Sequence, residues 1–525
     1  MSGAGQRLAD LTAGLVAVPA ELRVNDVTLD SRAVTAGSLF LACRGRTHHG
    51  LKFASEAIAR GAKAVLYESS GPGEPLQPPE RIAAQLGNGI FVAAVPQLSR
   101  HVGVIADRFF AAPSQALTVA GITGTNGKTT CAWLLTQALQ HVNRPAAYMG
   151  TLGYGVPPKL TTTEHTTSDA VSVHRQLAEL RQLGAECVCM EVSSHAVDQE
   201  RVAGVRFNTA AFTNLTRDHL DYHGTMEAYG AAKARLFDWP SLANRIVNID
   251  DPFGAKLALR TSQARLVVTS RTCGAGLGTS ARAGAGSIPG ADTSTIPHSG
   301  FVRAVRTVPE SAGLRIAVAS SWGETELKVP LVGEFNVDNV LTVLAVLLSW
   351  GIPLGRASGA LEQCRAPSGR MELFGGTRAA PLAIVDYAHT PDALAKALQG
   401  ARLHCRGRLR VVFGCGGDRD AGKRPLMGAI ATELADEVIV TDDNPRTEDP
   451  ARIVADILDG VTDKAALEVE HDRARAIALA LRRSSPEDVV LIAGKGHEDY
   501  QIHGELRRAF SDQAVVSAEL AGGHP

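Results

Sequence analysis

Short apolar runs bounded by turn residues recur along the chain, and helical patterns lie between them. In the first hundred residues these runs are Leu39–Ala42, Ala64–Leu66 and Ile90–Ala94, while Phe53–Arg60 has helical spacing. Apolar runs of this length are typical of strands that helices cover on both faces of a parallel sheet. The pattern predicts a small α/β unit at the start of the chain.

The middle of the chain repeats this pattern on a larger scale. A helical stretch runs from Cys131 to Leu139, and Val340–Trp350 is a candidate core helix. Leu314–Leu331 alternates around a turn at Trp322, as a strand hairpin does. Residues 273–300 are dense in Gly, Ala, Ser and Thr, which is typical of a flexible surface loop. The expected strands of the middle part are Ala116–Ile122, Cys187–Val192 and Arg245–Ile249.

The last part of the chain alternates strand and helix patterns most regularly. Strands are expected at Leu409–Phe413, Glu437–Thr441 and Asp488–Ile492, with amphipathic stretches between them. This alternation predicts a parallel, doubly wound, Rossmann-like sheet. With a boundary near Pro367, the expected domains are residues 1–97, 98–367 and 368–525, all of the α/β class.

Composition supports this organisation and narrows the function. A chain of 525 residues with 45% hydrophobic and 20% charged residues fits several globular domains. A net charge of −1 gives no long-range attraction for nucleic acid. No apolar run has transmembrane length, and the eight cysteines include no CxxC pair. We therefore expect a monomeric protein of the cytoplasm that binds no nucleic acid and does not insert into membranes.

The clearest chemical signal is the segment GITGTNGKTT at Gly121–Thr130, which follows an expected strand and precedes an expected helix. Glycines let backbone N–H groups approach phosphate oxygens, and a helix N-terminus favours negative charge. Lys128 can reach the β- and γ-phosphates, and the Thr129 hydroxyl is suited to Mg²⁺. The usual phosphate-loop pattern has Gly where this chain has Ile122. The sequence predicts a binding loop for a nucleoside triphosphate.

A second group of polar residues follows the three expected C-terminal strands. These residues lie in the segments Gly414–Arg419, Asp442–Arg446 and Gly494–Glu498. If the strands are neighbours, Arg419, Arg446, an asparagine and a glutamate converge at the carboxyl edge of the sheet. Arginines bind carboxylates in a bidentate manner and a carboxylate binds an ammonium, so this set suits a zwitterion. Ordinary turn chemistry explains each loop equally well when it is taken singly.

A third group lies in the middle part. Glu191 ends an expected strand, where phosphate-loop proteins often have a metal-binding carboxylate. The segment Thr213–His223 adds several histidines and aspartates. A lone histidine is more often structural than a ligand, but Mg²⁺ near Thr129 needs further oxygen ligands.

Together these motifs resemble the Mur ligases, ATP-dependent enzymes that form amide bonds in peptidoglycan precursors. The resemblance rests on GTNGKTT at Gly124–Thr130 and extends from about Leu29 to Gln501. Further matching segments are Glu191–His195, Thr213–His219, Asn336–Asn339, Gly369–Glu372 and Asp386–His389. The segment Asp443-Asn-Pro-Arg446 resembles the members that add meso-2,6-diaminopimelate to UDP-MurNAc-L-Ala-D-Glu. Diaminopimelate differs from lysine by a distal carboxylate, which an extra arginine can bind.

The resemblance implies an ATP site and a magnesium site. It implies catalytic roles for Lys128, Glu191, His219, Lys233, Arg370, Asp386 and His389. Residues implied in ATP binding are Gly124, Thr125, Asn126, Gly127, Lys128, Thr129, Thr130, Asn336, Asn339 and Arg370. Those implied in holding Mg²⁺ are Thr129, Glu191, His219 and Lys233, the lysine as a carbamate (N6-carboxylysine). The cofactors expected are therefore ATP and Mg²⁺.

The resemblance also implies two small-molecule substrates and the side chains that meet them. UDP-MurNAc-L-Ala-D-Glu is expected at Ser31, Arg46, Thr47, His48, Thr166, Thr167, Ser193, Gln199 and Arg201. Meso-diaminopimelate is expected at Arg419, Asp443, Asn444, Pro445, Arg446, Gly494 and Glu498. The N-terminal domain would bind the UDP end, the central domain ATP and the C-terminal domain the amino acid.

Three alternatives stay open on the sequence alone. A folylpolyglutamate synthase shares this ligase architecture, but the separate N-terminal domain and the segment Asp443–Arg446 disfavour it. A phosphate-loop ATPase could use hydrolysis for conformational work without forming an amide. A degenerate binding protein would not need Lys128, Glu191 and Lys233 all to be present.

Overall fold

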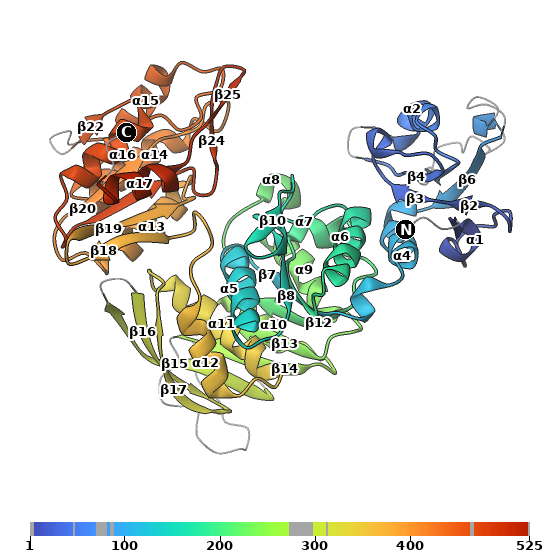
Figure 1. Cartoon of the computed structure of the whole chain (residues 1–525), viewed down its shortest axis with the longest axis horizontal. Coiled ribbons are helices and arrows are strands. Elements are labelled where there is room, and N and C mark those ends of the chain that lie inside the picture. The colour runs from blue at the N-terminus through green and yellow to red at the C-terminus, as the bar shows by residue number, and fades with distance from the viewer. Residues whose placement is uncertain are drawn as a thin grey trace. The chain divides into compact units, whose positions relative to one another are not determined.

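The structure is a computed structural model of the chain (Figure 1), and it describes residues 5–45, 48–69, 81–83, 89–271, 298–310, 313–462 and 467–522. The candidate residues Arg46 and Thr47, and nearly all of the expected loop at 273–300, lie outside these ranges. The chain packs into two compact units. The first comprises Met1–Lys128, Arg144–Arg245 and Thr261–Arg265, and the second comprises Thr129–Asn143, Ile246–Arg260 and Leu266–Pro525.

The first unit begins with the small parallel sheet that the sequence predicts. Its strand order is β3-β4-β5-β6, and every neighbouring pair is parallel. Leu39 and Leu41 face the core shared with α1 and α4, while Phe40 faces the core shared with α2. Helices therefore cover both faces, which explains the continuous apolar runs. The bounds are β1 Gln6–Arg7, α1 Leu8–Leu11, β2 Arg23–Val24, β3 Asp26–Thr28, η1 Ser31–Ala33, β4 Ser38–Ala42, η2 Gly50–Phe53, α2 Ala54–Ala59, β5 Ala64–Ser69, β6 Phe91–Pro96 and α4 Leu98–Phe109.

The rest of the first unit contains strands in the order β10-β9-β8-β11-β7-β12. The pairs β8–β11, β11–β7 and β7–β12 are parallel. Glu191, at the end of β11, pairs in register with Ile122 in β7, so the segments that follow these strands leave the same edge. The bounds are η3 Pro113–Gln115, β7 Thr118–Thr123, β8 Ala146–Gly150, β9 Gly153–Val156, β10 Lys159–Thr161, α6 Ala170–Gln182, β11 Cys187–Glu191, α7 Ser194–Asp198, β12 Phe207–Phe212, α8 Leu220–His223, α9 Met226–Ala234 and η4 Arg235–Asp238.

The second unit contains the remaining strands of the middle part, in the order β13-β14-β15-β16-β17. The predicted hairpin is confirmed, because β16 and β17 pair antiparallel from Leu314↔Val329 to Ser320↔Gly323. The predicted core helix is also confirmed and is longer, with most of its side chains fully buried. The bounds are α5 Lys128–His141, β13 Asn244–Asn248, α10 Pro252–Ala258, β14 Arg265–Ser270, β15 Gly300–Glu310, β16 Gly313–Ser320, β17 Gly323–Val329, α11 Phe335–Ser349 and α12 Leu354–Gln363.

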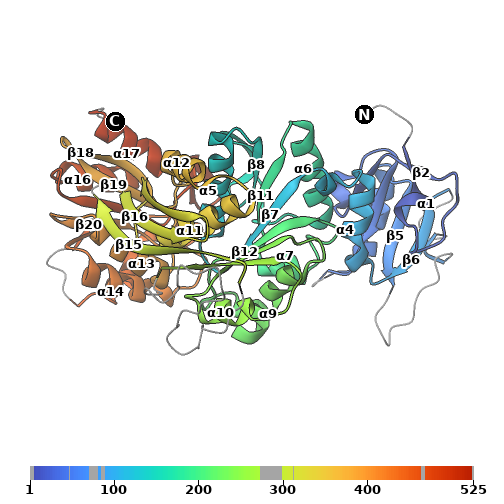
Figure 2. The same cartoon turned by 90° about the horizontal axis from the view of Figure 1, so that it is seen from below.

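The C-terminal sheet of the second unit has the order β18-β19-β23-β20-β21-β22 and is parallel except for β18. Val411 and Phe413 face the core shared with α13, α14 and α15, whereas Val412 faces the core shared with α16 and α17. Figure 2 shows these helices on the two sides of the sheet, so the doubly wound prediction is confirmed. The bounds are β18 Glu372–Thr377, β19 Ala380–Asp386, α13 Pro391–Arg402, β20 Leu409–Phe413, α14 Lys423–Leu434, β21 Glu437–Val440, α15 Pro450–Leu458, β22 Leu467–Val469, α16 Arg473–Arg482, β23 Val489–Ala493, β24 Tyr500–His503, β25 Leu506–Ala509 and α17 Asp512–Leu520.

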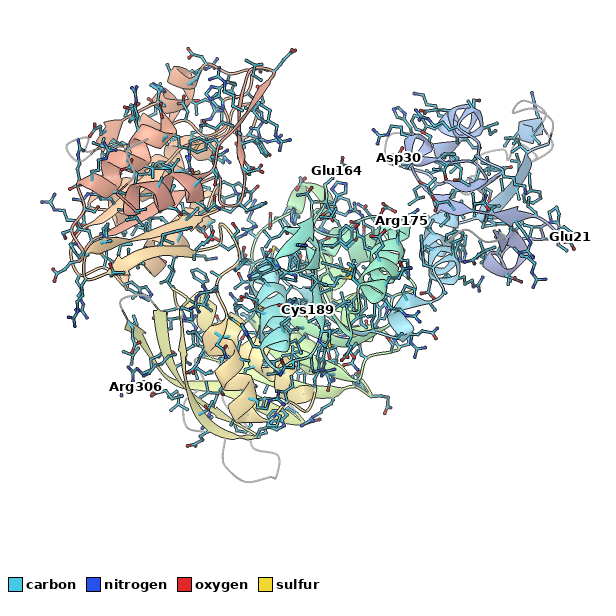
Figure 3. The ribbon with its side chains drawn as sticks, viewed as in Figure 1. Glu21, Asp30, Glu164, Arg175, Cys189 and Arg306 are labelled. Carbon is cyan, nitrogen blue, oxygen red and sulfur yellow. The ribbon has the colours of Figure 1, made fainter. Side chains whose placement is uncertain are left out.

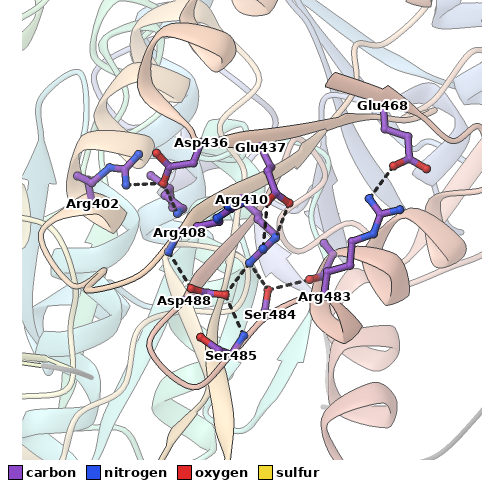
Figure 4. Close-up of polar contacts among 12 residues, drawn as sticks. Arg402, Arg408, Arg410, Asp436, Glu437, Glu468, Arg483, Ser484, Ser485 and Asp488 are labelled. Carbon is purple, nitrogen blue, oxygen red and sulfur yellow. Dashed lines mark hydrogen bonds and ion pairs between the residues drawn. The ribbon is translucent and has the colours of Figure 1, made fainter. Parts of the chain in front are cut away.

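An ion-pair network ties together the amino ends of three C-terminal strands (Figure 4). Arg410 of β20 contacts Glu437 Oε2 of β21 and Asp488 Oδ2, just before β23, each at 2.7 Å. Arg410 is almost fully buried, so its charge is balanced by these two carboxylates. The network lies at the edge opposite to the segments with candidate binding residues.

The structure also bears on the expectations about membrane-spanning segments and cysteines. None of the helices in these ranges is long and apolar enough to cross a bilayer. All seven cysteines in the described part of the chain are free thiols, and Cys189 (labelled in Figure 3) is buried in β11 together with Cys187. Strand ends differ from the predictions by one or two residues, as for β7 and β23.

Candidate active site

The predicted phosphate loop connects the end of β7 to the start of α5. Gly124 and Gly127 have φ angles of 149° and 85°, which residues with a side chain rarely adopt. A Cβ on Gly124 would lie 1.9 Å from Thr213 Oγ1, so only glycine fits there. Thr213 Oγ1 in turn donates to Asn126 O at 2.6 Å. The loop is thus held in shape by its own chain, and the N-terminus of α5, which favours negative charge, follows it directly.

Two lysines converge on one carbonyl of this loop. Lys128 Nζ donates to Gly124 O at 3.0 Å and to Thr125 O at 2.8 Å. Lys233 Nζ of α9 donates to the same Gly124 oxygen at 2.7 Å and lies 4.4 Å from the centre of the Tyr229 ring. Lys233 is only 1% exposed, and in the described part of the chain no carboxylate lies within ion-pair distance of it. Burial, and secondarily the Lys128 ammonium, lowers the pKa of Lys233 well below its usual value.

Glu191 is a fully buried carboxylate at the carboxyl end of β11. Oε1 accepts hydrogen bonds from the Tyr148 hydroxyl and, at 2.9 Å, from Thr151 N. Oε2 accepts from Thr151 Oγ1 at 3.3 Å. These three donors are a phenol hydroxyl, a backbone N–H and a threonine hydroxyl, and a buried carboxylate at this strand end is chemically suited to bind a cation.

Several aromatic and imidazole rings from α7, α8 and α9 and the segments beside them lie close together in space. The His195 ring centre lies 4.8 Å from that of His219 and 4.2 Å from that of Tyr222. His219 also lies 6.0 Å from Tyr229, the ring that Lys233 contacts. Burial, followed by the neighbouring imidazoles, lowers the pKa of His195 to about 4. Within the described ranges, no group of three or more His, Cys, Asp or Glu side chains has metal-binding geometry.

Four of the residues expected at the UDP-sugar peptide form one connected group. Arg201 donates through Nη1 to Thr167 O at 2.9 Å and through Nε to Gln199 Oε1 at 3.0 Å. Thr167 Oγ1 donates to Glu191 O at 2.9 Å and accepts from Ser193 N at 3.2 Å. The fifth, Thr166, lines a small pocket with Thr167, and the pocket walls include Met149 and Met190. The structure therefore brings these residues together beside Glu191.

Two further residues expected at this substrate lie in the N-terminal part. Ser31 is buried, and its hydroxyl donates to Glu56 Oε2 at 2.8 Å. His48 is exposed, and its carbonyl accepts from Gly45 N at 2.9 Å. No contact joins these two residues to each other among the described interactions. Their role in binding stays a prediction.

The C-terminal binding residues do converge as predicted, because β23, β20 and β21 are neighbours. Asn444 Nδ2 donates to Glu498 Oε2 at 2.8 Å. Arg446 has a φ of 53° and donates through Nη1 to Gly417 O at 2.7 Å. A Cβ on Gly416 would lie 2.9 Å from Arg446 Nη1 and 3.8 Å from Arg419 Cγ, so both arginines border this turn.

Asp443 lies beneath the same loops. It is nearly fully buried, and a Cβ on Gly494 would lie 2.6 Å from its Oδ2 atom. Burial raises the pKa of Asp443, and the nearby Arg473 and Lys495 oppose this shift. Glycine at 494 is therefore needed for the close approach of this carboxylate to the turn. The preceding Asp442 and the following Pro445 complete the segment.

The remaining candidates lie on β19 and its flanking turns and on α11. Asp386 accepts from Met371 N at 2.8 Å and from Ala388 N at 2.9 Å, so it fixes the turn that carries Arg370. The Arg370 guanidinium lies 4.7 Å from the Tyr387 ring centre. Burial lowers the pKa of His389, whose Nδ1 is 2.8 Å from Tyr387 O. On α11, Asn339 Nδ2 donates to Asn336 Oδ1 at 2.8 Å and Asn336 Nδ2 donates to Val332 O at 2.8 Å.

Three family models match the chain over most of its length. They are the Mur ligase family catalytic domain at residues 23–95, the Mur ligase middle domain at 122–347 and the Mur ligase glutamate ligase domain at 369–496. The chain belongs to the Mur ligase family. It is therefore an ATP-dependent ligase, in agreement with the phosphate loop described above.

Individual Mur ligases resemble the chain from end to end. A UDP-N-acetylmuramoyl-L-alanyl-D-glutamate–2,6-diaminopimelate ligase of Pseudomonas aeruginosa is 45% identical over 501 residues, which are 95% of this chain and 96% of that protein. The corresponding protein of Alkalilimnicola ehrlichii is 48% identical over 497 residues, 94% of each chain. A solved structure with the same protein name has 32% identity and a TM-score of 0.69, and covers 99% of both chains.

A solved structure of a further ligase supports the fold alone. The UDP-N-acetylmuramoylalanyl-D-glutamyl-2,6-diaminopimelate–D-alanyl-D-alanyl ligase of Acinetobacter baumannii is 19% identical, with a TM-score of 0.61 over 94% of this chain and 95% of that one. The three-domain α/β fold predicted from the sequence is the fold of these Mur ligases.

Sequence reasoning did not find two side chains that shape this Mur ligase site. Tyr148 donates to Glu191 from the buried strand β8, where its hydroxyl is the only polar side-chain group in the segment Ala146–Gly150. Lys495 is fully buried between Gly494 and Gly496 and contacts Asn444 and Glu498. Two sequence features could have indicated these residues. One is a tyrosine in an otherwise apolar strand, and the other is a lysine in the turn that follows an apolar strand.

Proposed function

We propose that this Mur ligase joins meso-2,6-diaminopimelate to the D-glutamate of UDP-MurNAc-L-Ala-D-Glu in peptidoglycan precursor synthesis. Two relatives named for a 2,6-diaminopimelate ligase, 45% and 48% identical over nearly the whole chain, support the proposal. The observation that carries it is the pair of arginines, Arg419 and Arg446, that border the Gly416 turn beside Asn444 and Glu498.

The amino-acid pocket has the charges that diaminopimelate requires. This substrate carries two carboxylates and two ammonium groups, whereas lysine lacks the distal carboxylate. An arginine binds a carboxylate through two parallel hydrogen bonds, and Glu498 can accept from an ammonium. We assign this substrate to Arg419, Asp443, Asn444, Pro445, Arg446, Gly494 and Glu498.

We assign ATP binding to the phosphate loop at Gly124–Thr130 and to Asn336, Asn339 and Arg370. Lys128 would exchange its loop carbonyls for the β- and γ-phosphate oxygens, and the N–H groups of Gly124–Thr130 would complete the cradle. Asn336 and Asn339 present amide groups suited to adenine or ribose. Arg370, Asp386 and His389 would act near the transferred phosphoryl group, where a guanidinium opposes the developing negative charge.

Mg²⁺ would be held by Thr129, Glu191, His219 and a carbamate on Lys233. The donor set fits the ion: Glu191 is a buried carboxylate at the end of β11, and hydroxyl and carboxylate oxygens are hard ligands. Lys233 as an ammonium would repel a cation. Its lowered pKa favours the neutral amine, which adds CO₂ to give a carbamate and a proton. When bound, Mg²⁺ supplies charge neutralisation for the phosphates.

The UDP-MurNAc dipeptide would lie along Ser31, Arg46, Thr47, His48, Thr166, Thr167, Ser193, Gln199 and Arg201. Arg201 already binds both Gln199 and Thr167, so these residues form a preorganised polar surface beside Glu191. Such a surface orients the terminal carboxylate of the dipeptide towards the γ-phosphate without further ordering of side chains.

The chemistry follows from the need to activate a carboxylate. The D-Glu carboxylate would attack the γ-phosphorus of ATP, giving an acyl phosphate and ADP. The diaminopimelate amine would then attack the acyl carbon, so that an amide forms, phosphate leaves and the amine loses a proton. Lys128 and Arg370 would stabilise the charge during phosphoryl transfer. We propose domains at 1–97, 98–367 and 368–525, a monomeric chain, and a cytoplasmic reaction, since ATP and UDP-linked precursors are cytoplasmic metabolites.

Phosphate release in the presence of ATP, Mg²⁺ and UDP-MurNAc-L-Ala-D-Glu tests the proposal. Meso-diaminopimelate, L-lysine and no amino acid are compared, and the product mass is measured. We expect release with diaminopimelate alone and a product heavier by one diaminopimelate residue. Equal use of lysine would overturn the assignment of Arg446. Release without any amino acid would instead indicate an ATPase that uses hydrolysis for conformational work.

A further inference from the structure

Lys495 is a buried cation that the reaction described above does not use. It lies in the turn directly after β23, and its side chain is completely inaccessible to solvent. Its ammonium lies 5.4 Å from the centre of the Tyr500 ring at the start of β24. A lysine is almost never fully buried unless its charge is paired, so its partners indicate why it is there.

Its partners are the polar side chains of the amino-acid pocket. Nζ donates to Asn444 Oδ1 at 3.2 Å and to Glu498 Oε2 at 3.2 Å. It also lies 3.9 Å from Asp443 Oδ1. An ammonium has three donors, and these three oxygens surround it. Lys495 therefore connects the two loops that follow β21 and β23.

These contacts determine which way the Asn444 amide points. Its Oδ1 atom accepts from Lys495 Nζ and, at 3.0 Å, from Ile502 N of β24. With two donors facing one end of the amide, that end must be the oxygen, because an NH₂ group there would face an ammonium and an N–H. The Nδ2 end is then fixed as a donor, and one of its hydrogens goes to Glu498 Oε2 at 2.8 Å.

The consequence is a defined pattern of donors and acceptors. The second Nδ2 hydrogen of Asn444 makes no hydrogen bond within the described part of the chain and can meet a substrate carboxylate. Glu498 Oε2 is fully engaged by Asn444 and Lys495, which leaves Oε1 to accept from a substrate ammonium. Without Lys495, the amide could rotate and Glu498 would lose the cation that holds it.

We propose that Lys495 is a positioning residue for amino-acid recognition, which acts by fixing Asn444 and Glu498 in their binding orientations. The inference rests on the proposed function, since it concerns the same pocket. It predicts that Lys495 affects the amino acid alone, because none of its contacts involves a residue assigned to ATP or to the UDP-dipeptide.

Steady-state kinetics of Lys495→Met test this role. Loss of charge-assisted hydrogen bonds should raise KM for diaminopimelate by roughly ten- to a hundredfold. The KM for ATP and kcat at saturating amino acid should stay within about threefold of wild type. Lys396→Met is the matched control, because Lys396 forms an exposed ion pair with Asp392 of the same helix, and among the described residues it has no other ion-pair partner. Equal rises in KM for ATP and diaminopimelate would overturn the proposal.

A double-mutant cycle with Asn444→Ala separates positioning from a general structural role. Because Lys495 is proposed to act through Asn444 and Glu498 together, Lys495→Met should raise KM by a smaller factor in the Asn444→Ala background, where only Glu498 is left to be positioned, than in the wild-type background. Full additivity would overturn the proposal. Should Lys495→Met fail to fold, Ile502→Pro removes the other donor to Asn444 Oδ1 and should raise the same KM. Wild type that makes no diaminopimelate product would refute the proposed function instead, so the two failures are distinct.

Discussion

Replacing Asp512 should destabilise the C-terminal sheet more than any substitution of an exposed charge in the same helices. Asp512 and Arg473 form a completely buried pair, with Arg473 Nε–Asp512 Oδ1 and Arg473 Nη2–Asp512 Oδ2 distances of 2.7 Å. Arg473 Nη2 also donates to Ala493 O at 3.1 Å, at the end of β23. The pair thus joins α16, α17 and the strand edge that carries the amino-acid pocket.

The expected loss of folding free energy depends on which buried polar groups each variant leaves without a partner. Asp512→Leu leaves a buried guanidinium without its hydrogen-bonded carboxylate, which costs about 3–5 kcal/mol. For a domain of this size, that corresponds to a fall in Tm of roughly 6–20 °C. Combining it with Arg473→Met removes the stranded charge and leaves only Ala493 O without its donor, at a cost of about 1–3 kcal/mol. The double variant should therefore be more stable than Asp512→Leu alone.

Differential scanning calorimetry at one scan rate is the assay. Arg475→Met serves as control, because Arg475 of the same helix α16 lies 3.8 Å from Asp472 and both of these side chains are exposed. Its Tm should not differ from wild type beyond the scatter of replicate scans. If the double variant is as unstable as the sum of the two single variants, a stranded charge is not the source of the instability and the reasoning is wrong.

Four further outcomes are expected. Lys233→Ala should abolish ligation and be partly rescued by added short carboxylates, measured by phosphate release, whereas activity without rescue would remove its metal role. Arg446→Ala should raise KM for diaminopimelate by roughly ten- to a hundredfold and leave that for ATP unchanged. Gly124→Ala should eliminate ATP binding in calorimetric titration, because its Cβ would lie 1.9 Å from Thr213 Oγ1 and the loop would have to change shape. Burial raises the pKa of Glu437, but the hydrogen bonds and charges of Arg410 and Arg408 together lower it by more, so the net pKa lies below the usual glutamate value. This pair therefore stabilises the fold above about pH 4.3, and the benefit is lost as pH falls through the lower folded pKa, so Arg410→Met should show a smaller loss of Tm on acidification than wild type.

The order of strands and helices was readable from the sequence because both faces of each parallel sheet are covered. Leu409–Phe413 is continuously apolar, and the structure buries all five residues as β20. Positions of strand ends were less exact, since β7 ends at Thr123 rather than Ile122. The ends of an element depend on which backbone groups find partners, and composition only biases that choice.

The positions of the binding motifs were also predictable from the sequence. The glycines of the loop at Gly124–Gly127 have the positive φ angles that a phosphate loop requires. The carboxyl ends of β20, β21 and β23 carry the polar segments that a doubly wound sheet brings to one crevice. In the phosphate loop, neighbours in sequence supply the decisive geometry, whereas the three polar segments converge because β20, β21 and β23 are neighbours in the sheet.

Only the tertiary structure decided which distant side chains control these local motifs. Sequence alone indicates a solvated helix residue at Lys233, yet folding places its ammonium on Gly124 O at 2.7 Å, beside Lys128 and away from water. The sequence likewise predicts only a turn residue at Lys495. In the fold its buried ammonium contacts both Asn444 and Glu498 of the amino-acid pocket. Backbone preferences and hydrophobic periodicity act over a few residues, so the sequence determined the elements and the loop chemistry. Desolvation and charge pairing depend on residues far apart in the chain, so the fold determined which groups are buried, paired and shifted in pKa.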